Sequence, residues 1–159
     1  MTEKTNVMRI LDKAKIEYRT YDYTNSGAIS GKDVAISMGQ DPSKVFKTLV
    51  TQAKSKQYYV FMIPVLNELD LKKAAKAVGE KALSMIPQKE LLSVTGYIHG
   101  GCSPIGMKKS FKTCIDLSAQ NIDNIIFSAG KIGKQVETSP NSLKDFINAK
   151  YFDLVKSDD

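Results

Sequence analysis

The sequence predicts one domain of the α/β class (mixed α+β), in which helices flank a mixed β-sheet. Segments with apolar residues at helical spacing alternate along the chain with short runs rich in β-branched and aromatic residues. The composition is that of an ordinary globular protein, with 42% hydrophobic and 25% charged residues. Because no internal repeat or linker-like run divides the chain, we expect residues 1–159 to form a single domain.

The beginning of the chain predicts a helix, a strand and a second helix. Thr5 and Asn6 precede apolar residues at helical spacing, and either residue can cap a first helix. Residues 18–23 alternate aromatic and polar side chains, as in a half-buried strand. Ser30 then precedes a second helical segment, which Gly39 ends.

A hairpin and a third helix follow. Residues 44–52 and 58–65 are rich in β-branched, aromatic and apolar residues, and a polar turn separates them. These two runs predict a pair of strands. Asp70 then caps the segment LKKAAKAV, which ends at Gly79 and predicts a helix.

The second half of the chain predicts two more helices and three strands. Pro87 begins a short helix that reaches Leu92, and the Ser139–Pro140 pair begins a last helix toward Asn148. The three strands are expected at residues 111–116, 125–128 and 135–138.

Composition excludes several classes of protein. No apolar run approaches the ~20 residues that span a bilayer, and the N-terminus is periodic rather than continuously apolar. We therefore expect a cytoplasmic protein without a membrane segment or signal peptide. Two cysteines and one histidine have neither the number nor the spacing of a zinc site, so we expect no metal and no cofactor.

The charge is compatible with a nucleic-acid partner. Lysine and arginine total 23 against 17 acidic residues, a formal net charge of +6. Several lysines lie beside glycines, which suits a phosphate-bearing ligand better than lysines spread along one helix. These lysines are Lys108, Lys109, Lys112, Lys131 and Lys134.

The segment YIHGGCSPIGMKK holds the only histidine, His99, and one cysteine, Cys102. One interpretation is a Cys–His nucleophilic pair, which needs the imidazole within reach of the sulfur and a third group to orient it. The other is a backbone-shaped pocket, in which Gly100 and Gly101 present N–H groups to a carbonyl oxygen or a phosphate. No carboxylate lies nearby in the sequence to orient the histidine, which favours the second interpretation.

Lys47 is a further candidate because it emerges from the apolar run VFKTLV. Such a lysine either lies on the solvent face of a strand or directs its cation into a pocket. The hydroxyl of Thr48 would lie on the other face of the same strand.

Four stretches together resemble the YbaK/EbsC family of bacterial aminoacyl-tRNA deacylases, relatives of the editing domain inserted in prolyl-tRNA synthetases. They are residues 45–50, 69–79, 95–109 and 127–140, with the pattern GGxSPxGxKK as the most specific part. The resemblance covers nearly the whole chain. It implies a mixed, partly barrel-like β-sheet flanked by helices.

The resemblance also implies an activity, which is to clear cysteine wrongly attached to the proline tRNA, with Cys-tRNA(Cys) as an additional substrate. In the family, the thiol of the substrate attacks its own ester carbonyl and releases a thiolactone and free tRNA. The implied partners are the 3′ end of aminoacyl-tRNA and prolyl-tRNA synthetase in a ternary complex. Neither a metal nor a cofactor takes part.

Catalytic roles are carried over by position. Lys47 matches the essential lysine of the family, which would hold the phosphate of the terminal adenosine or the aminoacyl group. Gly100 and Gly101 would donate backbone N–H groups to the ester carbonyl. Four further residues are implied to bind substrate: Tyr21, Thr48, Ser103 and Ser128.

Some positions depart from the pattern of the family. Gln135 occupies a site that is acidic in some relatives, and Ser30 occupies one that can be aromatic; both could alter the choice of substrate. Cys102 stands where many relatives have an aliphatic residue, and we interpret His99 as a loop histidine. Two alternatives stay open at this point: a deacylase for another mischarged tRNA such as Ala-tRNA(Pro), and a non-catalytic module that binds tRNA or a nucleotide.

Overall fold

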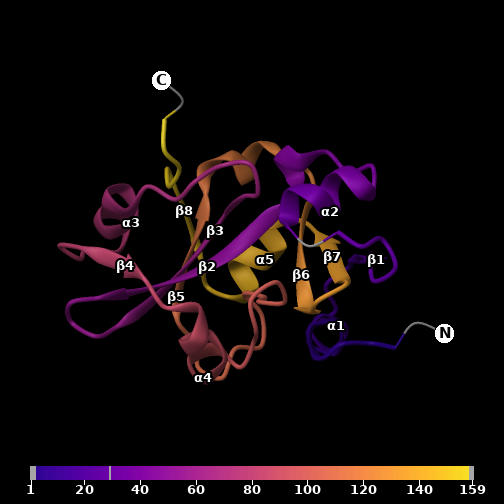
Figure 1. Ribbon diagram of the computed structural model, residues 1–159, viewed down its shortest axis with the longest axis horizontal. Helices are drawn as coiled ribbons and strands as arrows, with labels where there is room; N and C mark the ends of the chain where they lie inside the picture. The colour runs from indigo at the N-terminus through magenta and orange to yellow at the C-terminus, as the bar shows by residue number, and fades with distance from the viewer. Residues whose placement is uncertain (1–2, 29, 158–159) are drawn as a thin grey trace.

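The computed structural model describes residues 3–28 and 30–157, in which two β-sheets lie side by side and helices pack around them (Figure 1). The larger sheet has five strands in the order β4-β2-β3-β5-β8, and the smaller has three in the order β1-β7-β6. The mixed α/β class expected from the sequence is confirmed.

The five-stranded sheet is mixed in direction. β2 pairs with β3 and β4 in antiparallel fashion, whereas β3 pairs with β5, and β5 with β8, in parallel fashion. The β2–β3 pair is the predicted hairpin. The strands are β2 (Phe46–Ala53), β3 (Tyr58–Pro64), β4 (Leu83–Met85), β5 (Lys112–Asp116) and β8 (Lys150–Phe152).

The three-stranded sheet is antiparallel throughout and comprises β1 (Arg19–Asp22), β6 (Ile125–Lys131) and β7 (Lys134–Thr138). Its β6 meets the larger sheet where Val45 forms a parallel bridge with Ile126. Because β4 pairs only with the end of β2, at Thr51–Ala53, the edge of the earlier half of β2 faces the smaller sheet. The described strands do not close into a barrel.

Five α-helices begin at the caps that the sequence predicts, or close to them. Thr5, Ser30, Asp70 and Ser139 each accept a hydrogen bond from a backbone N–H in the first turn of the helix that follows. Around Pro87 the predicted helix is divided into a 3-10 turn, η2 (Gln88–Glu90), and the helix α4 (Leu91–Thr95). The other helices are α1 (Asn6–Lys13), α2 (Gly31–Ser37), α3 (Leu71–Val78) and α5 (Pro140–Phe146).

Two large hydrophobic clusters hold these elements together. The first lies where α1 and α5 pack on both sheets, with Leu11, Phe127 and Leu143 buried at its centre. The second lies between α3 and the larger sheet, around Phe61. The first cluster contains residues of both sheets and so fixes their junction, where the candidate site lies. In the part of the chain that the structure describes, no helix is long and apolar enough to cross a membrane.

Candidate active site

A cavity of about 350 Å³ opens where the edge of β2 faces the smaller sheet. Its walls come from β2, the first turn of α2, the loop that follows α4, and strands β6 and β7. Four of the predicted site residues line it together, although they lie far apart in the sequence. They are Lys47, Thr48, Gly100 and Ser128.

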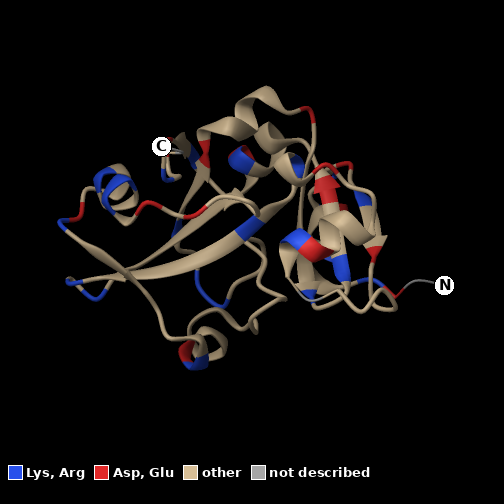
Figure 2. Cartoon of the chain, turned by 45° about the horizontal axis from the view of Figure 1, so that its top comes forward, with Lys and Arg blue, Asp and Glu red and all other residues tan. Residues whose placement is uncertain are grey.

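Lys47 is a half-buried cation without a partner. Side chains alternate along β2, so Lys47 and Thr48 extend from opposite faces, and both reach the cavity at the strand edge. Lys47 is the one basic residue of β2. Figure 2 shows lysines and arginines, in blue, on helices and strands throughout the fold. Partial burial lowers the pKa of its ammonium group, and the charge of Glu68 opposes that shift. Within the described residues, the ammonium makes no ion pair or hydrogen bond.

Thr48 brings an unused hydroxyl to the same cavity. Its Oγ1 is buried and has no hydrogen-bond partner among the described residues. A buried polar group without a partner costs free energy, and a ligand in the cavity could supply the missing bond. Lys47 and Thr48 thus both suit a ligand that carries oxygen atoms.

The two adjacent glycines have different positions. Gly100 lines the cavity with a φ of +88°, a left-handed backbone conformation that residues other than glycine rarely adopt. Gly101 does not line it, and its N–H donates to the Ile98 carbonyl at 3.0 Å. A Cβ atom at Gly101 would lie 3.1 Å from the backbone nitrogen of Ile132, a tight contact that favours glycine there. Gly100 therefore faces the cavity, whereas Gly101 shapes the turn.

The opposite wall of the cavity comes from the smaller sheet. Ser128 accepts a hydrogen bond from Gly130 N at 3.1 Å through its Oγ. Gln135 is only 5% exposed, and its Oε1 accepts a hydrogen bond from Gln40 Nε2 at 2.9 Å. Gln135 thus lies in the cavity wall.

Tyr21 and Ser103 do not line the cavity. The Tyr21 hydroxyl donates to Glu137 Oε1 at 2.7 Å, and Ser103 is fully buried with its Oγ accepting from Ile105 N. Their contacts with a substrate stay predictions. Tyr23 and Lys32 line the cavity instead, and the sequence analysis did not identify them. Tyr23 lies two residues beyond Tyr21, so the same alternation could have identified it.

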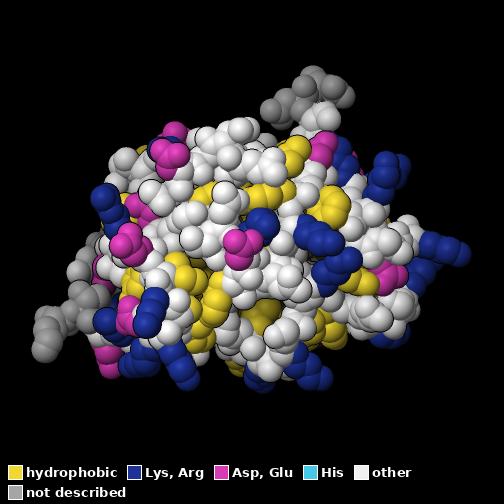
Figure 3. Space-filling view, turned by 180° about the vertical axis from the view of Figure 1, so that it is seen from behind, with side chains coloured by type: hydrophobic (Ala, Val, Ile, Leu, Met, Phe, Trp, Pro, Cys, Tyr) yellow, Lys and Arg dark blue, Asp and Glu magenta, His cyan; other side chains and the backbone are white. Residues whose placement is uncertain are grey.

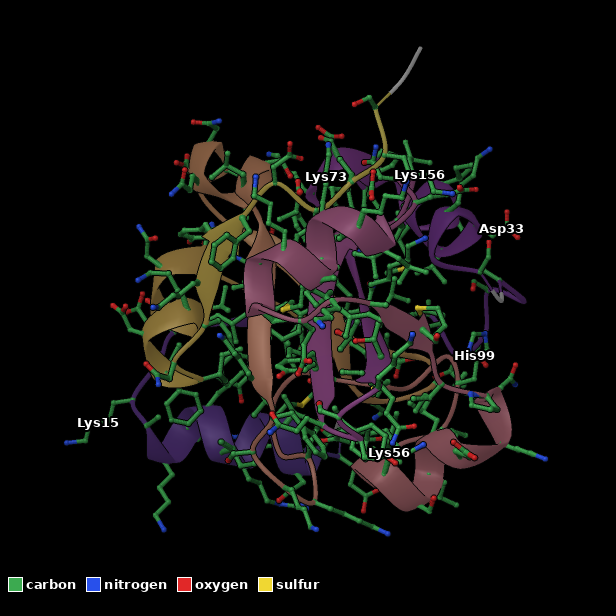
Figure 4. All side chains as sticks on the ribbon, turned by 90° about the vertical axis from the view of Figure 1, so that its left-hand side faces the viewer. Lys15, Asp33, Lys56, Lys73, His99 and Lys156 are labelled. Atoms are coloured by element: carbon green, nitrogen blue, oxygen red, sulfur yellow. The ribbon has the colours of Figure 1, made fainter. Side chains whose placement is uncertain are left out.

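Cys102 and His99 both line the cavity, but they do not form an activated pair. Burial raises the pKa of the Cys102 thiol to about 11, so the thiol is protonated at neutral pH and is a poor nucleophile. No hydrogen bond joins it to His99 in the described part of the chain. His99 is exposed on the loop that follows α4, on the same side of the molecule as Asp33 of α2 (Figure 4).

The cavity is positively charged. Among the described residues that line it are Lys32 and Lys47 but no aspartate or glutamate. The described residues contain no group of three His, Cys, Asp or Glu side chains that could hold a metal ion. The site therefore offers cations and hydrogen-bond donors, which suit a phosphate or an ester carbonyl.

Comparison with known families assigns the class of protein. The family model described as the aminoacyl-tRNA editing domain matches residues 27–146, and the chain belongs to this family. Over 153 residues it is 42% identical to a protein of Enterococcus faecalis provisionally named Cys-tRNA(Pro)/Cys-tRNA(Cys) deacylase EbsC. That alignment covers 96% of this chain and 93% of the relative.

More distant relatives share the fold. Over 122 residues, the chain is 24% identical to a proline–tRNA ligase of Pelobacter propionicus, covering 77% of this chain and 21% of the ligase. A crystal structure described as a candidate trans-editing enzyme for prolyl-tRNA synthetase superposes with a TM-score of 0.82 at 20% identity. It covers 98% of this chain and all of that structure, as expected for a common fold.

Proposed function

We propose that the protein is a free-standing aminoacyl-tRNA deacylase that clears Cys-tRNA(Pro) and also accepts Cys-tRNA(Cys). The observation that carries this proposal is the cavity itself. It joins an unpaired ammonium, an unpartnered hydroxyl and a cavity-facing glycine, and contains no activated nucleophile of the protein. The family, and the name of the relative that is 42% identical, support the choice of substrate.

A site without its own nucleophile needs one from the substrate. The thiol of the cysteinyl group attacks its own ester carbonyl, so that a carbon–sulfur bond forms and the carbon–oxygen bond to the ribose breaks. The proton of the thiol ends on the released ribose hydroxyl, and the products are a cyclic thiolactone and free tRNA. The ester is already reactive, so holding the thiol near the carbonyl can supply much of the rate.

The residues of the cavity would position the substrate for this step. Lys47 holds the phosphate of the terminal adenosine or the aminoacyl group, and the Thr48 hydroxyl donates to an oxygen beside it. The N–H of Gly100 points to the carbonyl and stabilises the negative charge that develops on it. Ser128 and Gln135 limit the pocket on the other side.

The partners follow from the same chemistry. The 3′ end of aminoacyl-tRNA occupies the cavity, and prolyl-tRNA synthetase joins the complex to select the proline tRNA. The similarity to part of a proline–tRNA ligase supports this link. An enzyme that edits tRNA charging works where translation takes place, which is in the cytoplasm.

The test is a panel of tRNA(Pro) charged with cysteine, serine, alanine or S-methylcysteine, with and without the synthetase. We expect rapid loss of cysteine and recovery of the thiolactone as first product. Serine differs from cysteine only by oxygen in place of sulfur, and S-methylcysteine has its sulfur blocked. Both should be lost at least ~100-fold more slowly, because no thiol can attack.

The other outcomes distinguish the alternatives. Equal turnover of alanine would assign the protein to deacylation of Ala-tRNA(Pro) and contradict the thiol mechanism. Tight binding of tRNA(Pro) without loss of any aminoacyl ester would indicate a non-catalytic binding module.

A further inference from the structure

A second and larger cavity, of about 750 Å³, lies on another part of the molecule. Its walls come from α1, residues 104–107 and 109–114, α5 and the start of β8. It shares no lining residue with the first cavity, but the loop after α4 contributes to both, through Gly100 and Cys102 in one and residues 104–107 in the other. We call it the basic groove.

Three lysines at the basic groove lack counter-ions. Lys109, Lys112 and Lys150 are exposed and line it, and no aspartate or glutamate is among its described lining residues. None of the three forms an ion pair within the described ranges. Lys150 lies opposite Cys114 in the β5–β8 pair, and Cys114 is two residues beyond Lys112 on β5.

The charges of two of these lysines converge on one buried group. Burial raises the pKa of the Cys114 thiol, and the positive charges of Lys112 and Lys150 both oppose that shift. Cations held close together repel one another, and an anionic ligand removes this repulsion.

The groove also offers aromatic and polar contacts. Phe111 is half-buried and Phe146 is 41% exposed, and both line the groove together with Ser110 and Asn148. Aromatic side chains among lysines are typical of surfaces that bind nucleic acid, where lysines hold phosphates and rings contact bases or riboses. The view from behind, in Figure 3, shows a hollow with hydrophobic side chains at its floor and basic side chains around it.

The geometry of the larger sheet relates the groove to the first cavity. Strand β3 lies between β2 and β5 and pairs with both. Lys47 of β2 lies opposite Ile63 of β3, and Lys112 of β5 lies opposite Tyr59, four residues before Ile63 on β3. Four residues of a strand span about 13 Å, at ~3.3 Å for each residue. A single tRNA molecule is long enough to reach both places.

We propose that the basic groove binds the sugar–phosphate backbone of the same tRNA whose 3′ end occupies the first cavity. This inference rests on the proposed function. It divides the substrate between two sites: the first cavity binds the terminal adenosine and its amino acid, and the groove binds phosphates farther along the chain.

The test compares a long and a short substrate. The variant Lys109→Gln/Lys112→Gln/Lys150→Gln removes the three groove cations. The matched control, Lys72→Gln/Lys76→Gln/Lys81→Gln, removes three exposed lysines on and just after α3, none of which lines either cavity. Each variant is assayed on Cys-tRNA(Pro) and on 3′-cysteinyl-adenosine, which has no phosphate backbone. Thermal unfolding checks that both variants are folded.

The groove variant should have a KM for Cys-tRNA(Pro) raised by about tenfold or more. Its slope of log(kcat/KM) against log salt should become shallower by about 2 to 3, since each lost phosphate contact removes roughly one unit. Turnover of 3′-cysteinyl-adenosine should stay at the wild-type rate. The control variant should change KM by less than ~3-fold, because the charge of the molecule as a whole acts weakly at physiological salt.

Three results would overturn the proposal. The first is an equal rise of KM in the control variant, and the second is an equal loss of activity on the short substrate. The third is an unchanged KM with loss of binding to prolyl-tRNA synthetase, which would make the groove a protein-docking surface. If the wild type cleaves neither substrate, the proposed function fails. The affinity of the same variants for uncharged tRNA(Pro) then tests by itself whether the groove binds tRNA.

Discussion

Gln40 Nε2 donates a hydrogen bond of 2.9 Å to Gln135 Oε1, joining the turn after α2 to strand β7 in the wall of the candidate site. Gln135 is 5% exposed and Gln40 is half-buried, so this bond is partly buried. The chain thus holds this wall of the cavity with a neutral pair of amides.

The Gln40–Gln135 bond should be measurable as a coupling energy. Gln40→Leu leaves Gln135 Oε1 buried without a donor, so we expect the free energy of unfolding to fall by about 1 to 3 kcal/mol. The double variant Gln40→Leu/Gln135→Leu removes both partners and should recover part of this loss. Urea unfolding of the wild type, the single variants Gln40→Leu and Gln135→Leu, and the double variant gives the coupling directly. Strictly additive losses would show that the two amides do not interact.

Lys47 should matter for activity and not for stability. Lys47→Met keeps the unbranched apolar stem of the side chain and removes the cation, so we expect kcat/KM for Cys-tRNA(Pro) to fall by about 100-fold or more. The ammonium is partly buried without an ion pair, and its lowered pKa reflects the cost of that burial. The free energy of unfolding should therefore not decrease.

The matched control for this variant is Lys44→Met. Lys44 is exposed in the 3-10 turn η1 (Pro42–Lys44), just before β2. It should keep wild-type kinetics and stability. A Lys47→Met enzyme that deacylates at the wild-type rate would rule out the proposed role of the cation.

Cys102 should be dispensable for catalysis. Its thiol is protonated at neutral pH because burial raises its pKa to about 11, so Cys102→Ala should keep kcat/KM within ~3-fold of the wild type. The assay is single-turnover deacylation of Cys-tRNA(Pro). A loss of more than ~100-fold, with the fold intact by circular dichroism, would instead support a protein nucleophile.

Buried thiols should make the protein less stable in alkali. Burial raises the pKa of both Cys102 and Cys114 to about 11, from the 9.0 that is usual for an exposed thiol. Between these values the folded protein keeps protons that the unfolded chain has released, so the free energy of unfolding falls as pH rises. The stabilisation is complete below pH ~9, and about 2 to 3 kcal/mol per thiol is lost by pH ~11.

The double variant Cys102→Ala/Cys114→Ala isolates this effect. In urea unfolding at about pH 7, 9 and 11, the free energy of unfolding of this variant should decline less toward alkaline pH than that of the wild type. Tyrosines also ionise in this range, but they are the same in both proteins. Identical declines would show that the thiols do not titrate as we expect.

Local signals in the sequence located most of the elements. The caps Thr5, Ser30, Asp70 and Ser139 were all predicted and are all observed. A cap is identified easily because it satisfies backbone groups only a few residues away. The strands β4 and β8 were not predicted. Each has three residues, too few for alternation to be seen, and each exists because a neighbouring strand pairs with it.

The candidate site was predicted less completely than the elements. Lys47, Thr48, Gly100 and Ser128 do line one cavity, but Tyr21 and Ser103 do not, and Tyr23 takes the place expected for an aromatic residue. No pattern in the sequence indicates that the N–H of Gly101 donates a hydrogen bond to the carbonyl of Ile98. That bond depends on the path of the loop, which the packing of Ile132 against it determines.

By itself, the sequence determined the class of fold, the order of most of its helices and strands, and the family, because these depend on periodicity, on caps and on motifs of a few residues. Only the tertiary structure decided which residues share a cavity. The site lies where the edge of β2 faces the smaller sheet, and the bridge at this junction joins Val45 to Ile126, which are 81 positions apart in the sequence. The basic groove likewise forms from segments that meet only when the core packs. Contacts of this kind depend on the free energy of the whole fold, and no local pattern records them.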